Sequence, residues 1–196
     1  MPQSNNHKFN HLKIHSQYSI CEGAIKIDDL KDYCKENKIP CLGISDTSNL
    51  CGALEFAENI SKVGTQPIIG TQIYFKFEDT TGLLPLIALN EKGYKRIIEL
   101  SSRSYLENDA LSYPHLNFEE LLTNTDGIAL LTGTIHGLFG KLFEKARLDE
   151  ITKLYKILSS KFHDKFYLEI QRHGDQNEIA FEKYNLKQSA KIKIPI

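Results

Sequence analysis

Two histidines and a lysine alternate in the first apolar segment of the chain, H-L-K-I-H-S-Q-Y-S. They are His11, Lys13 and His15. In a β-strand, side chains alternate between the two faces, so a strand here would point all three the same way. Two imidazoles on one face could bind a metal ion, whereas an ammonium group has no lone pair to offer. The spacing therefore fits either a metal site or a metal site that has lost a ligand.

Further polar side chains stand where later apolar segments end, as in a hydrolytic metal site built from His, Asp and Glu. These residues are Glu22, Asp46, Gln72, Thr134, His136 and His173. Simpler structural roles stay open for each of them. Asp46 could cap the following helix, His15 could cap a turn, and His136 could lie in a loop. Only the joint placement of these residues favours a metal site.

The elements that would position these side chains alternate in type. Apolar segments typical of strands cover residues 12–15, 41–45, 67–75, 83–89, 127–132, 166–170 and 192–196. Helical spacing of apolar residues marks 30–34, ended by Pro40, then 53–60, 94–101 with Asn90 as N-cap, 151–162 and 178–191. This alternation predicts an α/β fold with a parallel sheet. Seven strands fit a barrel, in which sites gather at the carboxyl ends of the strands.

The overall composition is that of an ordinary globular domain. Of 196 residues, 41% are hydrophobic and 25% charged. Lys and Arg number 24 against 25 Asp and Glu, a balance that argues against a domain that grips a nucleic-acid backbone by itself. No apolar run reaches the roughly 20 residues that a membrane span needs, and the polar N-terminus lacks a signal-peptide core. We therefore expect a cytoplasmic protein without a membrane partner.

Four cysteines, Cys21, Cys34, Cys41 and Cys51, form no C-x-x-C pair. Zinc-ribbon and dithiol redox patterns are therefore absent. Cys34 and Cys41 occupy apolar periodic positions, which predicts buried free thiols in a reducing compartment.

Five strings, taken in order, resemble one family throughout. They are H-L-K-I-H-S-Q-Y-S-I-C-E-G-A-I-K-I, I-S-D-T-S-N-L-C-G-A-L-E-F, Q-P-I-I-G, L-N-E-K-G-Y-K-R-I-I-E-L-S-S and L-E-I-Q-R-H-G. The chain resembles the N-terminal polymerase-and-histidinol-phosphatase (PHP) domain of bacterial DNA polymerase III alpha subunits, from about His11 onward. The resemblance implies a distorted (βα)7 barrel over residues 11–196, after a flexible tail at 1–10. We expect this barrel to be incomplete at its C-terminus, because the family's final Asp-x-His motif would follow Ile196.

The resemblance also maps a metal site onto this chain, with losses. The family's H-x-H motif falls on Lys13 and His15, and its T-D-H motif ends in Thr47. The other mapped positions are Glu22, Asp46, Gln72, Leu83, Thr134 and His173. A cluster of divalent cations needs several converging lone-pair donors, so the resemblance implies a vestigial site without metal, cofactor or catalytic residues. We expect Lys13 to replace the metal charge by pairing with Asp46 or Glu22.

The resemblance implies a role in DNA replication. The parent enzyme would be a magnesium-dependent DNA-directed DNA polymerase, acting on DNA and deoxynucleotides with catalytic carboxylates outside this segment. A degenerate PHP domain would be structural, joined to the rest of the alpha subunit and docking the proofreading exonuclease subunit. Two alternatives stay open: a pure interaction module, and a metal-dependent phosphoesterase or 3′–5′ proofreading nuclease. In the second case His15, Glu22, Asp46 and His173 would hold one ion.

Overall fold

The computed structural model describes residues 9–109 and 112–196, so most of the predicted tail at 1–10 lies outside the described residues. The elements along the chain are α1 (Ile27–Asn37), β1 (Cys41–Thr47), α2 (Ala53–Ser61), β2 (Gln66–Phe77), β3 (Thr80–Ala88), α3 (Glu91–Leu106), β4 (His115–Asn117), α4 (Phe118–Thr123), β5 (Ile128–Leu131), α5 (Leu138–Glu144), α6 (Leu148–Phe162), the 3-10 helix η1 (His163–Lys165), β6 (Phe166–Tyr167) and α7 (Glu178–Ile192). The five predicted helical segments are confirmed, including the Asn90 cap, whose side chain accepts from the Gly93 amide.

The sheet is mixed, and the prediction of a parallel sheet was wrong at β3. Its strand order is β1-β2-β3-β5-β6, with β4 beside β2. Strand β3 runs antiparallel to both β2 and β5, whereas β1 and β4 run parallel to β2 and β6 runs parallel to β5. Phe77 pairs with Thr80 across a tight turn in which Glu78 has a positive φ of 52°. Such a hairpin reverses the chain, whereas a parallel connection needs a longer crossover.

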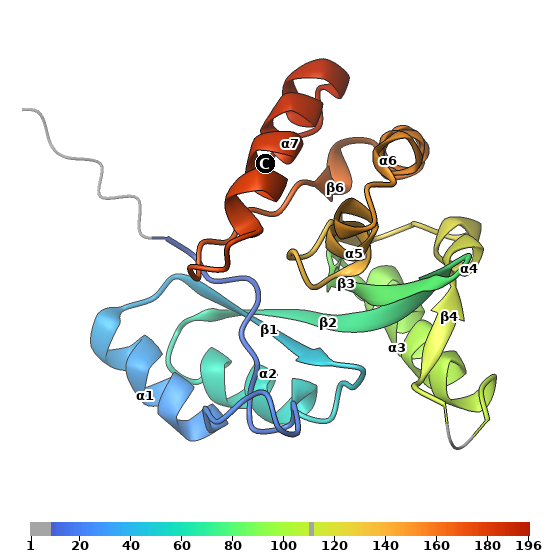
Figure 1. The fold of residues 1–196 in the computed structure, drawn as a ribbon. Helices are drawn as coiled ribbons and strands as arrows, with labels where there is room; N and C mark the ends of the chain where they lie inside the picture. The colour runs from blue at the N-terminus through green and yellow to red at the C-terminus, as the bar shows by residue number, and fades with distance from the viewer. Residues whose placement is uncertain (1–8, 110–111) are drawn as a thin grey trace, which may run out of the picture.

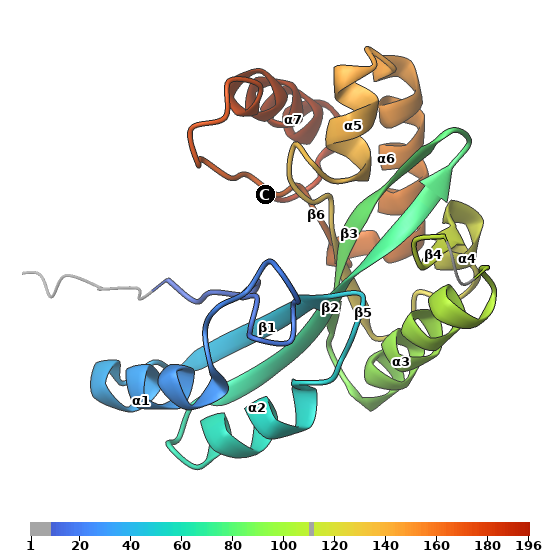
Figure 2. The ribbon, with the colours of Figure 1, turned by 60° about the horizontal axis from the view of Figure 1, so that its bottom comes forward.

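Helices cover the sheet in separate groups (Figures 1 and 2). Helices α1 and α2 lie together beside β1 and β2, and α5, α6 and α7 lie on the opposite side in Figure 1. A smaller core joins α1, β1 and α2 through Ile27, Leu42 and Phe56, while the larger core fills the rest of the domain around residues such as Phe75 and Tyr155. The site described below lies at strands β1 and β2.

The first segment runs along β1, but its backbone hydrogen bonds do not form a regular ladder. The Gly43 amide donates to the His11 carbonyl at 2.7 Å, and the Gly43 carbonyl accepts from the Ile14 amide at 3.3 Å. A regular parallel ladder would bridge residues two apart, so one extra residue is inserted here. His11 is exposed, with its ring 4.9 Å from that of Phe9, whereas His15 is half-buried. A β-carbon on Gly43 would stand 2.6 Å from the Leu12 carbonyl oxygen, so this crossing requires glycine.

The last predicted strand, residues 192–196, is not a strand. Helix α7 continues to Ile192 and ends at Lys193, which adopts a left-handed conformation with φ 61°. The segment beyond it lies beside the residue after β6, where the Leu168 amide donates to the Pro195 carbonyl at 2.9 Å. The distorted (βα)7 barrel, incomplete at its C-terminus, stays a prediction.

All four cysteines are free thiols. Cys34 is buried as predicted, Cys41 is only half-buried, and Cys21 and Cys51 are exposed. No helix in residues 9–109 or 112–196 combines the length and the apolar character that crossing a bilayer requires.

Candidate functional site

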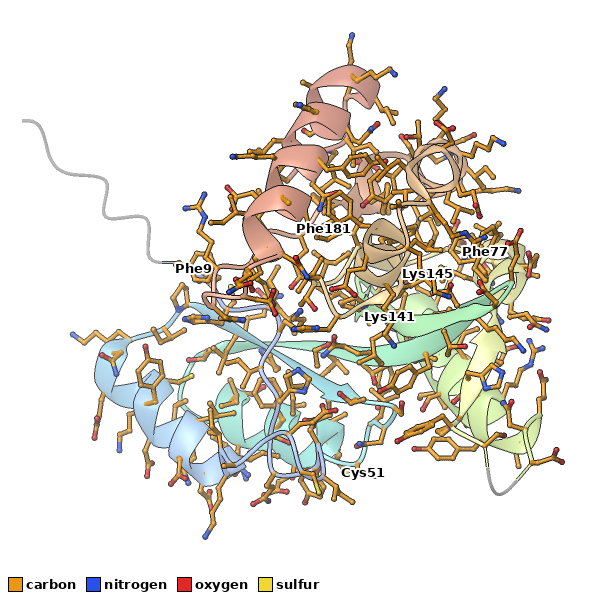
Figure 3. All side chains as sticks on the ribbon, in the orientation of Figure 1. Phe9, Cys51, Phe77, Lys141, Lys145 and Phe181 are labelled. Carbon is orange, nitrogen blue, oxygen red and sulfur yellow. The ribbon has the colours of Figure 1, made fainter. Side chains whose placement is uncertain are left out.

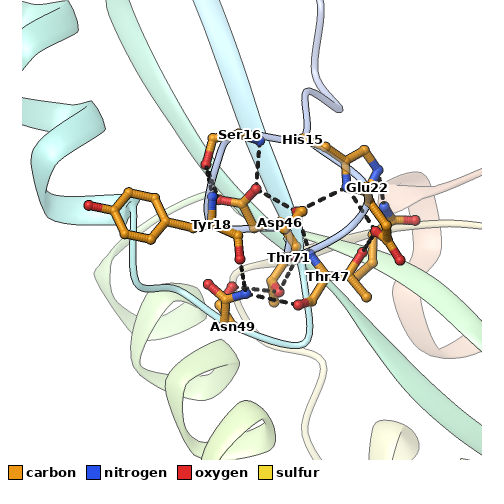
Figure 4. Close-up of polar contacts among 10 residues, drawn as sticks. His15, Ser16, Tyr18, Glu22, Asp46, Thr47, Asn49 and Thr71 are labelled. Atoms are coloured by element: carbon orange, nitrogen blue, oxygen red, sulfur yellow. Dashed lines mark hydrogen bonds and ion pairs between the residues drawn. The ribbon is translucent and has the colours of Figure 1, made fainter. Parts of the chain in front are cut away.

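Asp46, near the end of β1, holds the turn that follows the first segment (Figure 4). Its side chain is almost fully buried. Oδ1 accepts from the Ser16 amide at 2.7 Å and from the Ser19 hydroxyl at 2.6 Å, and Oδ2 accepts from the Ser16 hydroxyl at 2.8 Å. Asp46 is therefore no helix cap, since α2 begins only at Ala53. Both carboxylate oxygens serve the 16–19 turn.

The hydrogen bonds of His15 fix its protonation. The Ser19 hydroxyl gives its single proton to Asp46, so it accepts from the Thr47 amide at 3.1 Å and from His15 Nδ1 at 3.1 Å. The other ring nitrogen, Nε2, lies 2.7 Å from the side-chain amide nitrogen of Gln72. An amide nitrogen only donates, so Nε2 carries a lone pair and Nδ1 carries the hydrogen. His15 is a neutral imidazole whose metal-binding lone pair is occupied by Gln72.

The electrostatic surroundings agree with a neutral His15. Burial is the main cause that lowers the pKa of His15 below its usual value. The nearby Glu22 carboxylate opposes this shift, and the Lys13 ammonium adds to it. Glu22 Oε2 lies 3.4 Å from His15 Nδ1 and accepts from the Thr47 hydroxyl at 2.5 Å. The resemblance gave this position to a ligand histidine. Thr47 stands there instead, and its side chain donates a hydrogen bond to Glu22.

Lys13 pairs with Glu169, which corrects the expectation that it would pair with Asp46 or Glu22. Its ammonium group contacts Glu169 Oε1, and both side chains are about seven-eighths buried, with 13% and 12% exposed. The Gln171 side-chain amide also donates to Glu169 Oε1, at 2.7 Å. Asp46 and Glu22 have other partners instead: Ser16 and Ser19 donate to Asp46, and the Thr47 hydroxyl donates to Glu22. Sequence reasoning gave Glu169 no role, although an acidic residue inside the apolar run 166–170 was the signal.

The remaining mapped residues do not join His15 and Asp46. The imidazole of His173 is largely exposed and stands 3.7 Å from Glu178, although His173 lines a cavity of about 480 Å³ together with Lys13. His136 is exposed in the loop before α5, and its amide donates to the Thr134 hydroxyl. Leu83 is a β3 residue opposite Tyr74 of β2. The structure thus gathers five of the mapped positions: His15, Glu22, Asp46, Thr47 and Gln72.

These residues do not fit a metal cluster. In the described ranges, 9–109 and 112–196, no group of three or more His, Cys, Asp or Glu side chains could hold a metal ion. The donor chemistry gives the reason. Gln72 takes the free lone pair of His15, three donors engage the two oxygens of Asp46, and Lys13 brings a positive charge. Divalent cations require converging donors with lone pairs to spare.

Comparison with known proteins gives the class. A model of the PHP domain family matches residues 11–173, and the chain belongs to this family. It is 35% identical to the DNA polymerase III subunit alpha of Rickettsia felis, over 96% of this chain and 16% of that protein. The same subunit of Caulobacter vibrioides is 35% identical over 89% of this chain and 16% of its own length. That of Borreliella burgdorferi is 31% identical over 96% and 17%. The chain spans about a sixth of the length of these curated relatives.

A solved structure supports the fold. A crystal structure from Bifidobacterium adolescentis, named as a metal-dependent phosphoesterase, matches with a TM-score of 0.57. The match covers 94% of this chain and 84% of that one, at 12% sequence identity. At this identity the likeness concerns the fold alone. The predicted α/β fold of the PHP type is therefore confirmed.

Proposed function

We propose that this chain is the PHP domain of a bacterial DNA polymerase III alpha subunit and serves DNA replication. The observation that carries the proposal is the 35% identity to such subunits over nearly the whole chain. The complete enzyme would be a DNA-directed DNA polymerase, a nucleotidyltransferase that uses magnesium and works in the cytoplasm. Its polymerase active site, and its contacts with template and deoxynucleotides, would lie outside this segment.

Within that enzyme the domain would act as a structural unit rather than as a metal-dependent phosphoesterase. The hydrogen bonds around His15 and Asp46 support this role, because they use the groups that a metal would need. The Lys13–Glu169 pair supports it further, because a lysine stands at a position that the resemblance gave to a ligand. No metal or cofactor is proposed for this segment.

The proposed partners are the remainder of the alpha subunit and the proofreading exonuclease subunit. The second partner follows from the resemblance to polymerase PHP domains with degenerate sites. A direct test is biolayer interferometry between the immobilised chain and the purified exonuclease subunit of the same organism. Saturable binding is expected, and no binding at about 100 μM subunit would contradict the docking role.

A hydrolysis assay separates the structural role from the enzymatic alternative. The chain would be incubated with manganese and either a chromogenic phosphomonoester or a 3′-labelled oligonucleotide, beside a His15→Ala variant. We expect no turnover by either protein. Manganese-dependent hydrolysis that disappears in His15→Ala would instead favour a phosphoesterase or a proofreading nuclease.

A further inference from the structure

A second cavity lies outside the His15 cluster, against the outer part of the β2–β3 hairpin. It has a volume of about 470 Å³ and is lined by Tyr74, Thr81, Tyr113, His115 and Lys141. Lys141 belongs to α5 and points toward the hairpin in Figure 3. Small-molecule sites in proteins commonly measure a few hundred cubic ångströms. None of the mapped PHP positions contributes to this cavity.

Strand register gives the cavity a rigid floor. Tyr74 of β2 pairs with His115 of β4, and Lys76 pairs with both Asn117 of β4 and Thr81 of β3. Residues paired across a sheet share a face, and so do residues two apart in a strand. Tyr74, Lys76, Thr81 and His115 therefore look out from the same face. This face continues that of Gln72.

Two tyrosine rings form the aromatic wall. The ring centroids of Tyr74 and Tyr113 lie 5.9 Å apart at an interplanar angle of 53°. Tyr113 is 77% exposed, so its outer face is open to a ligand. The Tyr113 carbonyl accepts from His115 Nδ1 at 2.8 Å, so Nε2 is the ring nitrogen not used in this bond. The wall thus offers a flat apolar face beside a polar ring nitrogen.

Lys141 brings a positive charge to the cavity, and the lining contains no carboxylate. The Lys141 ammonium donates one of its three hydrogens to the Thr81 carbonyl at 2.8 Å. In the described part of the chain, neither Lys141 nor the exposed Lys76 forms an ion pair. Both cations remain available to an anionic group.

We propose that the cavity bounded by Tyr74, Tyr113, His115 and Lys141 binds one nucleotide unit of a single-stranded nucleic acid. The base would stack on the open face of Tyr113, since base–aromatic stacking is the common mode of sequence-tolerant recognition. Lys141 would neutralise the phosphate, and Lys76, paired with Thr81 in the sheet, would add a second cation on the same face. A net charge of −1 gives the chain no broad electrostatic grip on a backbone, which suits a pocket that works by stacking. This inference is argued from the side chains and does not rest on the proposed polymerase role.

Fluorescence anisotropy of a labelled ten-residue oligothymidylate, titrated with the full chain at low salt, tests the proposal. Tyr113→Ala is expected to weaken binding about tenfold, the scale of one lost base stack, and Lys141→Gln to weaken it severalfold. Tyr33→Ala, a change at an exposed tyrosine of α1, is the matched control and should stay within twofold. The same titration with a ten-residue oligouridylate shows whether DNA and RNA bind alike.

Photocrosslinking gives an independent readout. An oligonucleotide carrying 5-iodouracil should crosslink to Tyr113 or Tyr74, as located by mass spectrometry. The proposal would be overturned by no measurable binding, by equal binding of Tyr113→Ala and the parent, or by crosslinks confined to other elements. Displacement of the oligonucleotide by an acidic peptide but not by thymidine monophosphate would assign the cavity to a protein partner instead.

Discussion

Lys13 and Glu169 form an ion pair between two segments that are 156 positions apart in the chain. One belongs to the segment that runs along β1, and the other follows β6, at the far end of the strand order. Side chains thus connect the two ends of the sheet. The pair thus forms a cross-link between the first segment and the residues after β6.

Removing one partner of this pair should destabilise the fold. Lys13→Met leaves the Glu169 carboxylate largely buried without its cation, which should cost about 3 kcal/mol of unfolding free energy. Urea unfolding followed by circular dichroism measures the change. The double variant Lys13→Met with Glu169→Gln should be less unstable than the sum of the two single variants.

The exposed pair of Lys31 with Asp28 on α1 is the matched control. Because solvent screens it, Lys31→Met should change the unfolding free energy far less than Lys13→Met does. An effect of Lys13→Met as small as that of Lys31→Met would show that the Lys13–Glu169 pair does not hold the fold together.

Asp46→Asn should loosen the turn at residues 16–19. The carboxylate accepts three hydrogen bonds through its two oxygens. The side-chain amide of asparagine has only one oxygen to accept them, and its NH2 group would face the remaining donors. We expect a loss of about 2 kcal/mol in unfolding free energy, measured as a shift of the urea midpoint. Asp32→Asn on the exposed side of α1 is the control, and equal losses in the two variants would contradict the assigned role.

The lowered pKa of His15 predicts a loss of stability in mild acid. In the unfolded chain the imidazole titrates near pH 6.5, and in the fold it does so at lower pH because of burial. Below pH 6.5 the unfolded state therefore takes up the proton more readily than the folded state does. The stability contributed by neutral His15 is thus lost as the pH decreases. The stability difference between the parent and His15→Gln should shrink from pH 7.5 to pH 5.5. Imidazole nitrogen shifts should show the Nδ1–H form at pH 7.5, and an Nε2–H form would refute the hydrogen-bond assignment.

Gln72→Glu should reverse this behaviour. A carboxylate only accepts, so it would favour a hydrogen on His15 Nε2 and raise the pKa of His15 above its value in the unfolded chain. The stability linked to His15 would then be present at low pH and decline as pH rises through the new pKa. Titration of His15 by NMR measures the shift. Gln66→Glu, at the exposed start of β2, should leave the pKa of His15 unchanged.

Most helices could be predicted from the sequence, because amphipathic spacing sets them locally. The strand directions were missed for an identifiable reason. The predicted strands 67–75 and 83–89 are too close in sequence for a helical crossover, and this spacing already indicated the hairpin at Glu78. The predicted strand at residues 192–196 was wrong for another reason. The string I-K-I-P-I alternates like a strand, whereas Ile192 is the last residue of α7.

The site was only partly predictable, because hydrogen-bond partners depend on register. Residue types at strand ends indicated that His15, Asp46 and Gln72 stand near one another. An extra residue beside Gly43 interrupts the regular ladder of the first segment, although His11 and Lys13 still line one cavity. No periodicity shows such an insertion in advance, and none shows that Lys13 lies against Glu169 rather than beside Asp46.

Calorimetric titration of the purified full chain with zinc and with manganese tests the central claim, that hydrogen bonds and an ion pair occupy the place of a metal cluster. We predict no stoichiometric binding with either metal at neutral pH, and the same flat titration for His15→Ala. Tight binding of one or more ions per chain that is lost in His15→Ala would contradict the account.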